Sequence, residues 1–111
     1  MSYTFKTEEN ILIVTIDDER ATVEFSAELK KELLDKIEKE RNNVIFDLSK
    51  TNFVDSSFLG TLVAGLKKCT MNNGDLKIVG LQEPVRSMFE LTRLYKIFDI
   101  LDTVEEAIKA F

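Results

Sequence analysis

The segment 44–66, VIFDLSKTNFVDSSFLGTLVAGL, decides which fold this chain can adopt. Its first five residues form a nearly continuous apolar run, which is typical of a central β-strand covered on both faces. Apolar residues then recur with the spacing of one helix face, at Leu59, Leu62, Val63 and Leu66. A loop carrying Asp55, Ser56 and Ser57 lies between the two patterns. A strand, a loop and a helix in this order predict an α/β domain.

The N-terminal segment predicts a β-hairpin. Tyr3, Phe5 and Thr7 alternate with polar residues, and the β-branched run 11–16 follows them. Glu9 and Asn10 lie between the two runs and are suited to a turn.

A surface helix is predicted between the hairpin and the central strand. Leu29, Leu33 and Ile37 recur with a period of 3.6, and charged residues fill the other faces. Ser26 is the candidate N-cap of this helix.

The last third of the chain predicts two strands and two helices. The strands are 76–79 and 97–101, and Pro84 is suited to the first turn of the helix between them. Thr103, with Glu106 three residues later, predicts a capping box at the start of a closing helix.

The order ββαβαβαβα predicts one α/β domain over residues 1–111. We expect a mixed central sheet of about four to five strands, opened by a hairpin and packed with about four helices. A chain of 111 residues can bury one core without a disulfide or a metal, and no linker or repeat divides it.

Composition excludes several classes of function. Histidine is absent, which excludes Ser-His-Asp and Cys-His catalysis and His-ligated zinc. The single cysteine, Cys69, excludes an internal disulfide and a cysteine-rich metal cage. We therefore expect no enzymatic activity, no cofactor and no metal site.

Charge and hydropathy limit the partners and the location. The net charge of −5 is opposite in sign to a surface that neutralises phosphates, so we expect no nucleic-acid partner. The longest uncharged run, 56–66, has 11 residues, and a membrane span needs about 20. We expect a cytoplasmic protein with no membrane partner.

Asp55, Ser56 and Ser57 precede the apolar helix, where two roles are open. Such residues commonly cap a helix and do nothing else. A serine at this position would also be suited to phosphorylation, because unpaired backbone N–H groups and the positive end of the helix dipole favour an anion there.

The segment Asp55-Ser56-Ser57-Phe58-Leu59-Gly60, with the strand before it, resembles the Asp-Ser-Ser-Gly-Leu-Gly segment of bacterial anti-sigma-factor antagonists, the STAS domain family. The resemblance extends over nearly the whole chain. It implies a STAS-type fold, phosphorylation at Ser56 with Ser57 as the second choice, and a partner-binding surface formed by Asp55, Ser56, Ser57, Phe58, Leu59 and Gly60.

The resemblance also implies a working cycle without catalysis by the chain itself. The unphosphorylated protein would bind an anti-sigma factor that is also a serine kinase, and so release a sigma factor. The kinase would inactivate the protein by phosphorylating Ser56, and a PP2C-type phosphatase would reset it.

This chain departs from the family pattern at two places. Phe58 replaces the usual glycine, and it is either a partner anchor or part of the core. The loop 17–22, DDERAT, replaces the Gly-Glu-Leu-Asp often found in the family, so no single residue there is assigned to the partner. Gly60 lies in the first turn of a helix, where a close partner or a packed strand would explain a glycine.

The sequence leaves three other functions open. A receiver-like domain would accept phosphate on aspartate with Mg²⁺, using Asp17, Asp18 and Asp55. A constitutive STAS scaffold module would bind partners without a phosphorylation switch. A hydrolase with Ser56 or Ser57 as nucleophile would lack both a Gly-x-Ser-x-Gly elbow and a histidine base.

Overall fold

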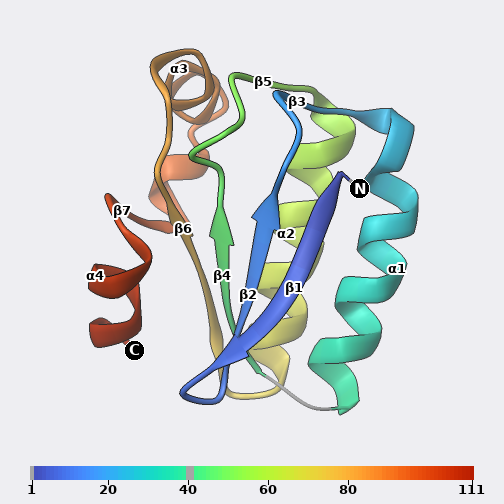
Figure 1. Cartoon of the computed structure of the whole chain (residues 1–111), viewed down its shortest axis with the longest axis vertical. Coiled ribbons are helices and arrows are strands. Elements are labelled where there is room, and N and C mark those ends of the chain that lie inside the picture. Colours follow the sequence, from blue (N-terminus) through green and yellow to red (C-terminus); the bar gives the residue numbers. More distant parts are fainter. Residues whose placement is uncertain (1, 40–41) are drawn as a thin grey trace.

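The computed structural model describes residues 2–39 and 42–111, and its centre is a five-stranded mixed sheet (Figure 1). The strand order is β1-β2-β4-β6-β7. The strands are β1 (Tyr3–Glu8), β2 (Ile11–Ile16), β4 (Asn43–Asp47), β6 (Asp75–Val79) and β7 (Asp99–Leu101). The first two are antiparallel and the other pairs are parallel, which confirms the predicted mixed sheet with an opening hairpin.

The same described residues form four α-helices. They are α1 (Val23–Lys39), α2 (Ser56–Met71), α3 (Glu83–Leu91) and α4 (Val104–Lys109), and the 3₁₀ turn η1 (Leu94–Lys96) follows α3. Figure 1 shows α1 and α2 together on one side of the sheet and α4 on the other.

The hairpin turn has the predicted residues. Glu9 and Asn10 have φ angles of 51° and 66°, and Glu8 pairs with Ile11. Two positive φ angles in a two-residue loop are those of a type I′ turn, whose twist matches that of the flanking strands.

Two apolar clusters explain why the central strands are apolar on both faces. The larger cluster lies between the sheet and α1 and α2, and it includes Val14 and Phe46. The smaller one contains Ile13, Ile45 and Ala107 of α4. Successive strand residues point to opposite faces, so both faces need apolar side chains.

The start of α1 differs from the prediction. The helix begins at Val23, and Ser26 is a buried residue inside it whose hydroxyl donates to the Thr22 carbonyl at 2.6 Å. The prediction of Ser26 as N-cap is therefore wrong. The helix starts earlier, where the Thr22 hydroxyl accepts from the Glu24 N–H at 3.3 Å and the Val23 N–H donates to the Asp55 carboxylate, 32 residues along the chain, at 2.9 Å.

The last strand is shorter than predicted. β7 begins at Asp99, and η1 precedes it. Phe98 is buried against Phe89 of α3, with ring centroids 6.0 Å apart, so it packs in the core and does not extend the strand.

A second, two-stranded sheet was not predicted. β3 (Arg20–Ala21) and β5 (Phe53–Val54) pair in parallel. Their pairing holds the loop after β2 beside the segment that leads into α2. Two residues are too short a run to give an alternating pattern in the sequence.

Phe58 belongs to the core, which decides between the two roles left open for it. Its side chain is 0 % exposed. The ring lies edge-on between Phe25 of α1, at 6.5 Å, and Phe46 of β4, at 6.2 Å. A large ring here fills the space between two helices and the sheet.

We expect Phe58→Ala to lower the free energy of unfolding by about 3 to 5 kcal/mol, because it removes a fully buried ring and leaves a cavity. Urea unfolding followed by circular dichroism measures the change. The control is Phe53→Ala, whose side chain is exposed and whose ring lies under the Arg20 guanidinium, at 4.2 Å, and which should cost less than about 1 kcal/mol. Equal losses for the two variants would contradict the assignment of Phe58 to the core.

Candidate functional site

One carboxylate caps two helices at the start of α2. Asp55 is the N-cap residue, and its Oδ1 accepts a hydrogen bond from the Phe58 N–H at 3.0 Å. Its Oδ2 accepts from the N–H of Val23, the first residue of α1, at 2.9 Å. The Asp55 N–H donates to the Ala21 carbonyl at 3.2 Å, which ties the same residue to β3. Asp55 therefore fixes the two helix N-termini relative to each other.

The capping role that the sequence left open falls to Asp55 and not to the serines. Ser56 and Ser57 are the first two residues of α2, and both are exposed. At these positions the Ser56 hydroxyl is accessible and close to the N-terminal end of a 16-residue helix. The free N–H groups and the dipole of such an end favour a negative charge.

A shallow cavity of about 300 Å³ lies beside the serines, between α1 and α2. We call it the α1–α2 hollow. Its lining residues are Val23, Ser26, Ala27 and Lys30 of α1, and Ser56, Ser57, Gly60 and Thr61 of α2. It combines an apolar side chain, two accessible hydroxyls and one cation.

Gly60 leaves an opening in the wall of the α1–α2 hollow. A Cβ atom placed on Gly60 would have no neighbouring atom within 4 Å. Packing of a strand against this glycine, one of the two explanations offered from the sequence, is therefore wrong. The residue exposes helix backbone at the surface, where another molecule can come close.

The six predicted partner-binding residues divide into two groups by burial. Phe58 and Leu59 point into the core, so their side chains are not part of the accessible surface. Ser56, Ser57 and Gly60 are exposed, and Asp55 is half-buried. The division follows from the period of the helix, because residues two positions apart point to roughly opposite sides of it.

Sequence reasoning missed the contribution of α1 to this surface. Val23 is an apolar side chain that is 67 % exposed, and Ala27 and Lys30 continue the same side of the helix. Their spacing of four and three residues was available as a signal. The spacing alone does not place these residues beside Ser56, because the contact between the two helix ends depends on Asp55.

The acidic residues proposed for a receiver-like site are used elsewhere. Asp17 pairs with Lys50 at 3.2 Å, and Asp18 accepts from the Arg20 N–H at 3.0 Å. Both oxygens of Asp55 are occupied by helix N–H groups. Over residues 2–39 and 42–111, no group of three or more His, Cys, Asp or Glu side chains could hold a metal ion.

Comparisons with known proteins agree with the geometry. The model of the STAS domain matches residues 2–107. A curated protein of Thermotoga maritima, described as "Putative anti-sigma factor antagonist", is 28% identical over 99 residues, which cover 88% of this chain and 88% of that protein. Across the described ranges, no helix is long and apolar enough to cross a membrane.

Solved structures show the same fold. A crystal structure from Thermotoga maritima, also titled a "putative anti-sigma factor antagonist", has a TM-score of 0.88 and 27% identity, covering 97% of this chain and 92% of that one. The anti-sigma factor antagonist SpoIIAA in its unphosphorylated form has a TM-score of 0.86 and 15% identity, covering 97% and 94%. The same named protein from Bacillus in its phosphorylated form has a TM-score of 0.77 and 14% identity, covering 97% of both chains. At these last identities the likeness concerns the fold alone.

We expect Asp55→Ala to lower the free energy of unfolding by about 2 kcal/mol, because it removes the cap of two helices at about 1 kcal/mol each. Asp55→Asn keeps one acceptor oxygen and should lose about half as much. Asp35→Ala is the control, since Asp35 is exposed on α1 and forms a surface ion pair with Lys39 at 3.2 Å. Urea unfolding of the three variants checks the order, and equal stability of Asp55→Ala and Asp35→Ala would refute the double cap.

Proposed function

Since this chain belongs to the STAS domain family, we propose that it is an anti-sigma-factor antagonist whose binding is switched by phosphorylation of Ser56. In its unphosphorylated form the protein binds an anti-sigma factor that is also a serine kinase, and this binding releases a sigma factor. The name of the Thermotoga relative supports the antagonist role. A PP2C-type phosphatase restores the unphosphorylated form.

One observation carries the proposal: the exposed Ser56 hydroxyl lies at the first residue of α2, beside the α1–α2 hollow. A kinase can reach this oxygen without unfolding the chain. The γ-phosphoryl group of ATP passes to Ser56 Oγ, ADP leaves, and the hydroxyl proton passes to a base of the kinase. The N-terminal end of α2 favours the resulting anion.

The switch acts through local charge and volume. A phosphoserine carries about −1.5 to −2 charges, and here it stands next to the carboxylate of Asp55. A partner that covers the α1–α2 hollow would have to bury that charge, which is costly unless a cation pairs with it. Lys30, the single cation among the residues that line the hollow, offsets only part of a charge of about −1.5 to −2. Partner affinity therefore falls without a change of fold.

The apolar part of the same surface supplies the affinity of the unphosphorylated form. Val23 is the exposed apolar side chain at the mouth of the hollow, and Gly60 allows close approach of a partner's backbone. Removal of exposed apolar area from water is the main favourable contribution to association. The partner thus contacts Val23 and Gly60, and its affinity depends on whether Ser56 is phosphorylated.

In this cycle the chain is a phosphoryl acceptor and not an enzyme. The cycle depends on ATP and on a sigma factor, so the protein would act in the cytoplasm. A constitutive scaffold would use the same surface without the chemistry at Ser56, and the experiment below separates the two.

We expect Ser56→Asp to reduce capture of the anti-sigma factor from native lysate by at least about tenfold, since it places a permanent charge beside the hollow. Ser56→Ala should capture the partner as wild type does and keep it when ATP is added. Ser57→Ala is the matched control, and ATP should release it as it releases wild type. Captured proteins are identified and quantified by mass spectrometry, and phosphopeptide mapping locates the modified serine.

Identical capture by wild type, Ser56→Ala and Ser56→Asp, with and without ATP, would exclude the switch and favour the scaffold. A phosphate found on Ser57, with ATP release lost in Ser57→Ala, would move the site by one residue.

A further inference from the structure

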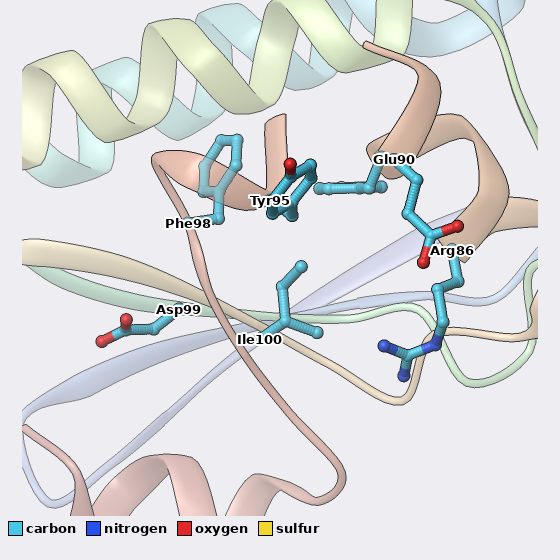
Figure 2. Close-up of a pocket in the computed structure, with 7 residues that line it drawn as sticks. Arg86, Glu90, Tyr95, Phe98, Asp99 and Ile100 are labelled. Atoms are coloured by element: carbon cyan, nitrogen blue, oxygen red, sulfur yellow. The ribbon is translucent and has the colours of Figure 1, made fainter. Parts of the chain in front are cut away.

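A second cavity, of about 640 Å³, lies between α3, η1 and β7 (Figure 2). We call it the α3–β7 cavity. Its volume is within the range of small-molecule sites, about 300 to 1,000 Å³. It has no lining residue in common with the α1–α2 hollow, and the proposed switch does not use it.

One end of the α3–β7 cavity is apolar. Phe89 and Phe98 are buried, and Ile100 is half-buried. The Tyr95 ring is 50 % exposed, although an aromatic side chain gains from burial. Figure 2 shows Tyr95 and Phe98 on one side of the cavity and Ile100 facing them. This arrangement is a slot for a flat or branched apolar group.

The other end carries one cation and one anion. Arg86 and Glu90 lie one turn apart on α3, and Figure 2 shows both side chains on the side of the cavity away from Phe98, with the Arg86 guanidinium extending away from the Glu90 carboxylate. Within the described part of the chain, neither side chain has an ion-pair partner within 4.0 Å. Both are therefore available to a ligand.

The third charged residue of the lining, Asp99, is already paired. Its carboxylate points away from the cavity in Figure 2 and accepts a hydrogen bond from Lys77 Nζ at 2.7 Å. Lys77 is 4 % exposed and also donates to Asp75 at 3.0 Å. Burial acts to lower the pKa of the Lys77 ammonium, but the hydrogen bonds to Asp99 and Asp75 outweigh it and raise the pKa. The pair holds β7 in place as one wall of the cavity.

We propose that the α3–β7 cavity binds a free α-amino acid with an aromatic or large aliphatic side chain. The ligand carboxylate pairs with the Arg86 guanidinium, and the ligand ammonium pairs with the Glu90 carboxylate. The ligand side chain lies in the slot between Tyr95 and Ile100. A ligand with a single charge would leave either Arg86 or Glu90 without a partner, whereas a zwitterion matches both.

The first test titrates the isotope-labelled full chain with L-phenylalanine and follows amide chemical shifts by NMR. We expect saturable shifts confined to residues 86–101. 3-Phenylpropionate lacks the ammonium group and phenethylamine lacks the carboxylate, so each should bind about tenfold more weakly, as expected for loss of one charge-assisted hydrogen bond.

Two variants assign the charged contacts. Arg86→Gln should weaken L-phenylalanine about tenfold and make it equal to phenethylamine, and Glu90→Gln should make it equal to 3-phenylpropionate. Lys6→Gln and Glu8→Gln are the matched controls, since these residues lie on β1 at the opposite edge of the sheet. Both controls should bind as wild type does.

Three results would overturn the proposal. Absence of saturable shifts at 86–101 would exclude the ligand class. Equal affinity for the three compounds would exclude the pair of charged contacts. Shifts that depend on protein concentration and not on ligand would mean that a second copy of the chain covers the cavity, since Leu91 and Ile97, the neighbours in sequence of the lining residues Glu90 and Phe98, are exposed apolar side chains.

Discussion

The candidate site depends on the two hydrogen bonds that the Asp55 carboxylate accepts from the N-termini of α1 and α2. Each helix end carries a partial positive charge, so two such ends would repel each other without an anion between them. Asp55 supplies this anion and also bonds to β3 through its own N–H. The α1–α2 hollow and the exposure of Ser56 both follow from the helix arrangement that this residue fixes.

The core gives that arrangement its rigidity. Phe58 and Leu59 point inward from the first turn of α2, while Ser56, Ser57 and Gly60 point outward. The accessible serine is therefore attached to a buried aromatic cluster two residues away. Displacement of Ser56 would require Phe58 to leave its packed position in the core. A phosphate would therefore change the surface more readily than the fold.

Elements with a local cause could be predicted from the sequence. The hairpin turn, Pro84 in the first turn of α3 and the cap at Thr103 each depend on residues a few positions apart. The failures come from contacts that periodicity does not show. The prediction of Ser26 as N-cap fails because Thr22 and the distant Asp55 accept hydrogen bonds from the first N–H groups of α1, and the strand predicted at 97–101 begins only at Asp99 because Phe98 packs on Phe89.

The sequence by itself determined the order of the five strands of the central sheet and of the four α-helices, and it identified the segment 55–60 as a candidate site, because periodicity, turn residues and motifs depend on neighbouring residues. Only the tertiary structure decided that Phe58 is core, that Val23 and Lys30 join Ser56 in one hollow, and that Arg86, Glu90 and Tyr95 line another cavity. These facts depend on the contact between a helix N-terminus and a carboxylate, and on the side chains against which each aromatic ring packs. The first two facts join residues of different helices, and the third depends on how the chain turns at η1 between α3 and β7, so periodicity along the sequence does not encode them.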